Sequence, residues 1–366
     1  MTKRRLSRPV TAGGVQIGGG APIPVQSMLN TPAHDFAGAL ALTERLQKAG
    51  CDIVRLAVPD VESAQAFSAL RAGGITLPLV ADIHFDYTLA LASVKAGASK
   101  IRLNPGNIGA EWKVREVAVA CKDAGIPIRI GVNGGSLAAD LRKTYGRPTP
   151  EALVESAFAQ AEMLEKFGFS DIVLSLKTSS VQDSVEVYRL AAQGCSYPLH
   201  LGVTEAGDSY TGLIKNAAGI GALLADGIGD TLRVSLTADV EEEVRAGREL
   251  LRIFGLDTRG GVEVISCPTC GRTKIDLLGL AARFKEAVKD IDTKGKTVKV
   301  AVMGCVVNGP GEARDADFGI AGGDGFAVLF RHGDVICRVE EDQIVRRLLD
   351  ETHQFLDGEA AIHNDC

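Results

Sequence analysis

The sequence predicts an α/β protein in which a (β/α)8 barrel of the TIM type is followed by a small α+β domain. From residue 24 onward, a short β-branched run that ends in a polar residue alternates eight times with an amphipathic stretch. Eight such units over roughly 230 residues match the size of a closed barrel of parallel strands. The alternation stops near Gly255, and the chain of 366 residues then has room for one further, smaller core.

The strand-like runs are separated by helical segments whose apolar residues recur every three or four positions. "FAGALALTERLQKAG" is one such segment, and "DVEEEVRAGRELLRIFG" follows the last run. A doubly wound open sheet is the alternative, but such sheets rarely need eight equal units, and no glycine-rich nucleotide fingerprint follows the first run. The eight runs begin at Val25, Asp52, Leu77, Lys100, Pro127, Asp171, Pro198 and Thr231.

Polar residues at the ends of these runs are considered together, because the reactive residues of such barrels lie at the carboxyl ends of the strands. Five of the eight runs end in Lys or Arg. A single arginine more often belongs to a surface salt bridge. Five cations at one mouth of a protein with net charge −6 instead indicate a compact, multiply charged phosphate ester, whose oxygens match the guanidinium group. The set comprises Asn30, Arg55, Asp82, His84, Arg102, Asn104, Arg129, Asn133, Lys177, Thr204, Glu205, Arg233 and Ser235.

Three members of this set are candidates for proton transfer. Glu205, in "TEAG" beside the cations, is the favoured acid, and Asp82 and His84 in "ADIHFD" are the others. A lone histidine at a strand end is more often a structural hydrogen-bonding residue, and this remains the alternative for His84.

Composition and charge exclude several classes of protein. A chain with 46% apolar and 23% charged residues is globular, and its net charge of −6 argues against a sequence-independent nucleic-acid binder. The basic start "MTKRRLSRPVTAGG" leads into Gly and polar residues, and no run of eighteen apolar residues follows. We therefore expect a cytoplasmic protein without a membrane partner. In that reducing compartment the eight cysteines do not indicate a disulfide framework.

After Gly255 the pattern changes to that of a small α+β unit. We predict a barrel over residues 1–255, a linker over residues 256–264 ("LDTRGGVEV") and a second domain over residues 265–366. Within the second domain, a loop with two cysteines precedes the helix "DLLGLAARFKEAVKDI" and the strand "KVAVMG". Two strands around "FAVLFRHGDVICRVE" and a last helix from about Asp342 complete it.

Three thiols in the second domain predict a metal site. "ISCPTCGR" places Cys267 and Cys270 three positions apart, and the next thiol is Cys305 in "MGCVVNGPGE". A zinc ribbon would bring a second Cys-x-x-Cys pair, so zinc held by three Cys and His332, and an iron–sulfur cluster, both remain open from the spacing. For a cluster, Glu312 after the "NGPG" turn would be the fourth, exchangeable ligand.

Five motifs, in order over nearly the whole chain, resemble the family of 4-hydroxy-3-methylbut-2-enyl diphosphate synthases in its bacterial two-domain form. They are "QSMLNT", "IRIGVNGGSL", "HLGVTEAG", "ISCPTCGR" and "MGCVVNGPGE". The resemblance implies a [4Fe–4S] cluster on Cys267, Cys270, Cys305 and Glu312, and electrons from a flavodoxin or ferredoxin. It also implies reductive ring opening of 2-C-methyl-D-erythritol 2,4-cyclodiphosphate in the non-mevalonate isoprenoid pathway, a substrate that fits the cationic mouth. On this hypothesis, the residues that bind the substrate are Arg55, Arg102, Arg129, Asn133, Lys177, Thr204, Arg233 and Ser235.

The position of the linker predicts a homodimer. The helix after the eighth strand runs antiparallel to that strand, so the chain leaves the barrel at the face opposite the mouth. A linker of about nine residues spans roughly 30 Å at most, which makes it awkward for the second domain to reach its own barrel mouth. We therefore expect a head-to-tail homodimer in which each second domain covers the barrel of its partner, and the architecture of the family agrees.

Three rival interpretations remain. A radical enzyme that uses S-adenosylmethionine would need a Cys-x-x-x-Cys-x-x-Cys loop early in the barrel, which this chain lacks. A pterin-binding barrel with a structural zinc appendage would contain zinc instead of iron and labile sulfide. A zinc-ribbon binding module would need exposed basic and aromatic stretches, and the acidic charge balance argues against it.

Overall fold

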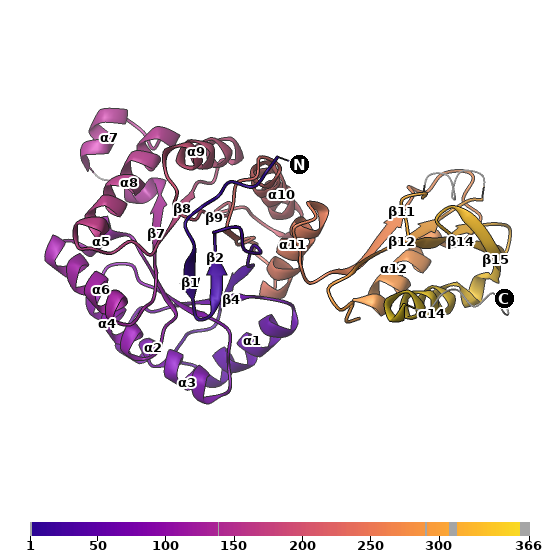
Figure 1. Ribbon diagram of the computed structural model, residues 1–366, viewed down its shortest axis with the longest axis horizontal. Coiled ribbons are helices and arrows are strands. Elements are labelled where there is room, and N and C mark those ends of the chain that lie inside the picture. The colour runs from indigo at the N-terminus through magenta and orange to yellow at the C-terminus, as the bar shows by residue number, and fades with distance from the viewer. Residues whose placement is uncertain (1, 138, 290, 307–312, 359–366) are drawn as a thin grey trace. The chain divides into compact units, whose positions relative to one another are not determined.

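The computed structural model describes residues 2–137, 139–289, 291–306 and 313–358. The chain forms two compact units, one that ends at Asp257 and one that begins at Thr258 (Figure 1). No helix within these described ranges is both long enough and apolar enough to cross a membrane.

The first unit is a closed barrel of eight parallel strands, as predicted. Six strands from β3 to β8 pair in sequence order, and β9 pairs with β10. Two single bridges, Leu174 to Leu199 and Val25 to Leu232, join this pair to both edges of the six-stranded sheet and close the ring. The strands are β3 (Gln26–Met28), β4 (Ile53–Ala57), β5 (Leu79–Asp82), β6 (Lys100–Leu103), β7 (Ile128–Asn133), β8 (Ile172–Lys177), β9 (His200–Leu201) and β10 (Thr231–Leu232).

Helices surround this barrel, and acidic or hydroxyl side chains begin most of the long ones (Figure 1). Asp239, for example, accepts a hydrogen bond from the backbone N–H of Glu241 at the start of α11, where three glutamates follow in the first turn. Such groups satisfy the unpaired N–H groups of a helix start. The helices are α1 (Phe36–Lys48), α2 (Val61–Ala64), α3 (Ala66–Ala72), α4 (Tyr87–Lys95), α5 (Pro105–Ile108), α6 (Glu111–Asp123), α7 (Ala139–Tyr145), α8 (Pro150–Lys166), α9 (Val181–Gly194), α10 (Ser209–Ala225) and α11 (Val240–Ile253).

The end of the barrel at which the strands begin is filled by an amino-terminal hairpin that the sequence did not predict. Strands β1 (Val10–Ala12) and β2 (Val15–Ile17) pair antiparallel. Their buried side chains pack against Ile53, Val80 and Val173, which lie near the starts of β4, β5 and β8. The amino-terminal end of the barrel is therefore filled with hydrophobic side chains, whereas the polar residues lie at the carboxyl ends of the strands.

The second unit is a five-stranded sheet covered by two helices. Strands β11, β12 and β13 are parallel, β14 and β15 continue the sheet antiparallel, and Phe284 of α12 and Leu348 of α14 belong to one core cluster with the sheet. Strand β11 begins inside the segment assigned to the linker, and β13 was not expected. The Val-x-Val alternation after Gly261 pairs with β12, although the two preceding glycines suggested a loop. The elements are β11 (Gly261–Ser266), α12 (Leu277–Val288), β12 (Thr297–Met303), β13 (Phe318–Gly322), β14 (Phe326–Arg331), β15 (Asp334–Glu340) and α14 (Ile344–Asp357).

Candidate active site

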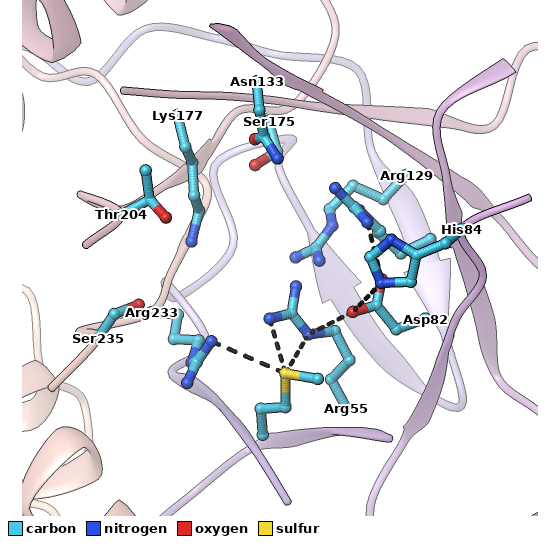
Figure 2. A pocket seen from close by; sticks show the side chains of 12 residues that line it. Arg55, Asp82, His84, Arg129, Asn133, Ser175, Lys177, Thr204, Arg233 and Ser235 are labelled. Atoms are coloured by element: carbon cyan, nitrogen blue, oxygen red, sulfur yellow. Dashed lines mark hydrogen bonds and ion pairs between the residues drawn. The ribbon is translucent and has the colours of Figure 1, made fainter. Parts of the chain in front are cut away.

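A polar pocket of about 300 Å³ opens at the carboxyl ends of the barrel strands (Figure 2). Ten residues of the predicted set line it, together with Met28 and Ser175, which no sequence pattern indicated. The side chains of Arg55, Arg129 and Lys177 point from different strands into the same space. The lining residues are Met28, Arg55, Asp82, His84, Arg102, Arg129, Asn133, Ser175, Lys177, Thr204, Arg233 and Ser235.

Strand register explains why these side chains meet. Asp82 of β5 is the register partner of Arg102 on β6, and Arg102 is the partner of Arg129 on β7. Register partners share a face of the sheet, and residues two apart on a strand point to the same side. Asn133 and Lys177, at the ends of β7 and β8, are likewise paired. The inward positions near the carboxyl ends of neighbouring strands therefore form one lining.

Asp82 is the acidic centre of this lining. Its Oδ1 atom lies 3.0 Å from Arg102 Nη1, and its Oδ2 atom lies 3.7 Å from Arg55 Nε and 3.8 Å from His84 Nε2. Burial alone would raise the pKa of Asp82, but the charges of Arg55 and Arg102, with smaller contributions from Arg129 and His84, outweigh burial and lower it. Asp82 is therefore ionised and holds two arginines in place.

A second carboxylate, Glu243 of α11, holds Arg233. The Glu243 side chain is 2% exposed, and its two oxygens lie 3.0 Å from Arg233 Nη2 and 3.1 Å from Arg233 Nε. Ser27 Oγ and the backbone N–H of Leu236 donate to the same carboxylate at 3.1 and 3.0 Å. A bidentate pair of this kind fixes the plane of the guanidinium. Glu243 was missed because three consecutive glutamates at a helix start read as a solvent-exposed turn.

Arg55 contacts two partners of unequal strength, the carboxylate of Asp82 and the thioether sulfur of Met28. Its Nε and Nη2 atoms lie 3.2 and 2.9 Å from the sulfur of Met28, and burial lowers its pKa to about 10 despite the opposing charge of Asp82. A thioether is a poor acceptor, so a phosphate oxygen would be a stronger partner for the same N–H groups.

Two glycines make room for the cations. A Cβ atom at Gly131 of β7 would lie 2.4 Å from Arg102 Nε, and one at Gly202 would lie 2.6 Å from Lys177 Nζ. Both distances are far below van der Waals contact, so a side chain at either position would displace a pocket cation. The glycines appear in "IRIGVNGG" and "HLGVTEAG", but only the three-dimensional contacts reveal this role.

The pocket has an excess of positive charge. Burial, and then the charges of Arg233, Arg55 and Arg129, lower the pKa of Lys177 well below its usual range. Five cationic side chains face the space, and Asp82 and Glu243 are the carboxylates that pair with them, which leaves three positive charges when Lys177 is protonated. A ligand with two or more negative charges would compensate this excess.

Glu205 does not line the pocket in this structure. It follows Thr204, which does, and its side chain is exposed. The backbone of Glu205 is in the left-handed region, with φ of 54°, a conformation that costs energy for a residue other than glycine. The loop after β9 therefore holds Glu205 in a strained conformation at the edge of the candidate site.

The free cysteines among the described residues of the second unit are Cys267, Cys270 and Cys305, and they lie on two loops that follow the carboxyl ends of β11 and β12. Cys267 directly follows β11 and Cys305 follows β12, and the ends of these parallel strands are register partners. The backbone N–H of Gly304 donates to Cys267 Sγ at 3.3 Å, and the backbone N–H of Lys274 donates to the carbonyl of Gly304 at 3.1 Å. The loop that contains Cys270 and the loop that contains Cys305 are thus bonded to each other.

None of these three thiols is fully buried in the core of the second unit. Cys270 is exposed and Cys267 and Cys305 are partly exposed, so thiolates here can bind a metal without rearranging the core. A backbone N–H directed at a ligating sulfur is a typical second interaction of such sites. Glu312 lies outside the described residues. Within the described residues, no three His, Cys, Asp or Glu side chains gather closely enough to hold a metal ion.

Comparisons with known proteins cover both units. Residues 7–248 match the family described as the GcpE TIM-barrel domain, and residues 263–354 match the GcpE protein C-terminal domain. The chain is 53% identical over 346 residues to the 4-hydroxy-3-methylbut-2-en-1-yl diphosphate synthase (flavodoxin) of Clostridium perfringens, covering 94% of this chain and 98% of that relative. A relative of the same name from Caldanaerobacter subterraneus is also 53% identical, over 97% of this chain and 99% of its own.

A solved structure shares the barrel alone. Dihydropteroate synthase from Thermus thermophilus superimposes with a TM-score of 0.53 at 16% identity, covering 68% of this chain and 98% of that chain. At this level of identity the similarity describes the fold and says nothing about the ligand.

Proposed function

The chain belongs to the GcpE family of 4-hydroxy-3-methylbut-2-en-1-yl diphosphate synthases, and from this premise we propose which of its residues carry out the reaction. The reaction is reductive ring opening and dehydration of 2-C-methyl-D-erythritol 2,4-cyclodiphosphate to 4-hydroxy-3-methylbut-2-enyl diphosphate, an oxidoreductase step of non-mevalonate isoprenoid biosynthesis. The predicted fold class, family and activity are thereby confirmed. Five cationic side chains line one pocket, and this observation is the main support for the assignment of residues.

The cationic pocket binds the cyclic diphosphate in this proposal. Arg55, Arg102, Arg129 and Lys177 contact its phosphate oxygens, and Arg233 adds a fifth cation held by Glu243. The same groups stabilise the charge that moves onto the diphosphate when the ring C–O bond breaks, because they are fixed before the substrate arrives. The residues that provide hydrogen bonds to the substrate beside these cations are Asn133, Thr204 and Ser235.

Glu205 donates the proton with which the departing hydroxyl leaves as water. Asp82 holds Arg55 and Arg102 in place, and His84 lies beside Asp82. The strained backbone of Glu205 next to a pocket residue supports this role. Glu205→Gln keeps the size of the side chain, and we expect turnover to fall about 100-fold or more while the visible absorption of the enzyme is unchanged. Glu162→Gln, an exposed position on α8, is the matched control. An unaffected rate in Glu205→Gln would remove Glu205 from this role.

Cys267, Cys270, Cys305 and Glu312 would hold a [4Fe–4S] cluster, in keeping with the iron–sulfur chemistry of the family. Such a cluster supplies two electrons to the substrate in single steps. Anaerobic purification should give about four iron and four sulfide per chain. Cys267→Ser should lose most of the iron and the brown colour, whereas Cys195→Ser in the barrel should keep both. Stoichiometric zinc in the anaerobic protein would contradict the assignment.

We propose a flavodoxin or ferredoxin as the electron donor and a homodimer as the active form. The names of the relatives contain flavodoxin, and the short linker predicted after the barrel favours a site completed by a partner chain. Mixing equal amounts of Cys267→Ser and Glu205→Gln tests the dimer, because each variant alone has little activity. With free exchange, half of the dimers are mixed and each has one intact cross-chain site, so the mixture should recover about a quarter of the wild-type activity. A mixture that stays inactive after demonstrated subunit exchange would contradict the cross-chain site.

A further inference from the structure

A second polar layer lies directly below the pocket. Gln26, Lys100, Arg129 and His200 come from β3, β6, β7 and β9, and each is at most 1% exposed. Because residues two apart on a strand share a face, Lys100 points into the barrel like Arg102, about 6.5 Å further from the mouth. Gln26, Lys100 and His200 occupy the interior between the pocket and the hydrophobic cluster of the hairpin, and Arg129 connects them to the pocket that it also lines. Barrels usually fill this layer with branched hydrophobic residues.

Most donors of this layer have no acceptor among the described residues. The buried atoms without a hydrogen-bond partner include Lys100 Nζ, Gln26 Nε2, Arg129 Nε and both ring nitrogens of His200. One contact links the layer internally, from Arg129 Nη1 to Gln26 Oε1 at 3.3 Å. An unsatisfied buried donor costs free energy, and a buried charge without a counterion costs more. The layer is therefore destabilising in the absence of a ligand.

The charges that face Lys100 and His200 are almost all positive. Arg55 of β4 and Arg129 of β7 act on Lys100, and His200 also faces Lys177 of β8. The pKa of Lys100 is lowered well below its usual range, first by burial and then by the charges of Arg129 and Arg55. The pKa of His200 is lowered by burial and then by Arg129, Lys177 and the other cations. The acid on the neighbouring strand β5 is Asp82, whose oxygens already contact Arg55 and Arg102. Lys100 Nζ thus has no carboxylate partner among the described residues and lies in an electropositive interior, which disfavours its charged form.

We infer that Lys100 is a reserve cation of the substrate site, which takes up a proton from solvent when the cyclic diphosphate binds in the pocket above it. The inference rests on the proposed function, because a ligand with two negative charges is what reverses the local potential. Lys100 is the acceptor in preference to His200 because an amine is the stronger base by about four pKa units. Lys100 is a positioning residue, since its charge acts on the ligand through the layer that contains Arg129.

The substrate itself does not supply the change in protonation. Each phosphorus of a cyclic diphosphate carries one strongly acidic oxygen, so the ligand keeps two negative charges throughout the neutral range. Lys177 lines the pocket and its pKa is also lowered, so a bound anion favours protonation of Lys177 as well. The number of protons that Lys100 takes up on substrate binding is therefore the difference in total proton uptake between the wild type and a variant without the amine.

Calorimetric titration of the oxidised holoenzyme with the cyclic diphosphate measures this uptake. At one pH between 7 and 9, the apparent enthalpy is recorded in buffers of different ionisation enthalpy, and its slope against that enthalpy is the number of protons bound. We expect Lys100→Met, which replaces the amine by an apolar side chain of similar length, to reduce the slope by about one proton. Lys95→Met, at an exposed position on α4, should leave it unchanged.

Affinity gives a second measurement. Uptake of a proton makes binding weaken as pH rises, by up to about tenfold per pH unit for each proton, and Lys100→Met should lose one such factor. The inference would be overturned if the wild type and Lys100→Met took up the same number of protons in either measurement, or if the wild type took up none. Loss of the slope in His200→Gln with retention in Lys100→Met would show that the assignment to Lys100 is wrong. Absence of binding to the wild type in equilibrium dialysis would instead contradict the proposed function.

Discussion

Replacing Glu243 by Gln tests whether a buried counterion positions the substrate arginine. The carboxylate accepts four hydrogen bonds, two from Arg233, one from Ser27 and one from the Leu236 backbone, at 3.0 to 3.1 Å. The amide has the same shape, but its N–H₂ group would face donors and the charge on Arg233 would lose its partner. Breaking a buried pair from one side costs about 3–5 kcal/mol. At about 2–4 °C per kcal/mol, the melting temperature should fall by roughly 6–20 °C.

Thermal unfolding followed by circular dichroism, with steady-state kinetics at permissive temperature, measures both consequences. Because Arg233 lines the pocket, we expect KM to rise about tenfold or more in Glu243→Gln and kcat to change less. The control is Glu249→Gln on the same helix, where the side chain is half exposed and the effect should stay within about 0.5 kcal/mol. A melting temperature equal to that of the wild type would refute the pairing argument. A fall in stability with unchanged KM would refute the positioning of Arg233.

Three further predictions concern the pocket lining. Gly131→Ala places a Cβ 2.4 Å from Arg102 Nε and should raise KM about tenfold, whereas Gly221→Ala on α10, with ordinary contacts, should leave KM unchanged in the same assay. The lowered pKa of Lys177 means that the folded state binds fewer protons than the unfolded chain, so below a pH of about 10 this residue destabilises the fold. Lys177→Met should therefore raise the urea midpoint at pH 7 while abolishing calorimetric binding of the substrate, and a lower midpoint would contradict this. The pKa of Asp82 is lowered, so its charge stabilises the fold above a pH of about 4 and this contribution is lost as pH falls. Asp82→Asn should be less stable than the wild type at pH 7, with a difference that shrinks below pH 4 in thermal unfolding, and a difference independent of pH would contradict the sign.

The positions of the pocket cations could be predicted from the sequence because they follow from the geometry of parallel strands alone. Parallel strands bring their carboxyl ends to one face, and period-two alternation decides which residues point inward. The contributions of Glu243 and Gly131 could not be derived in this way. Each depends on a contact with a residue distant in sequence or on another strand, Glu243 with Ser27 and Gly131 with Arg102. Burial of Glu243 follows from the docking of α11 over the barrel, and no local pattern indicates it.

The hairpin at the barrel bottom was missed for a similar reason. Its strands are three residues each and flank two glycines, which is too short for periodicity to detect. Its hydrophobic partners Ile53, Val80 and Val173 belong to three different barrel strands. The same limit applies to β11, where adjacent glycines suggested a linker although the next residues pair along all of their length with β12.

The hydrophobic hairpin and the cationic pocket have opposite effects on the stability of the barrel. Buried basic groups without counterions destabilise the barrel, and neither Asp82 nor Glu243 contacts Lys100 or Lys177 through a salt bridge within the described residues. The hydrophobic cluster of Val10, Ile17 and their strand partners fills the opposite end and stabilises the ring that holds these charges. A doubly charged ligand then supplies the missing counterions. Relief of the repulsion among these groups therefore adds to the binding free energy of the ligand, and a ligand at a hundred times its Kd stabilises the folded protein by about 2.7 kcal/mol.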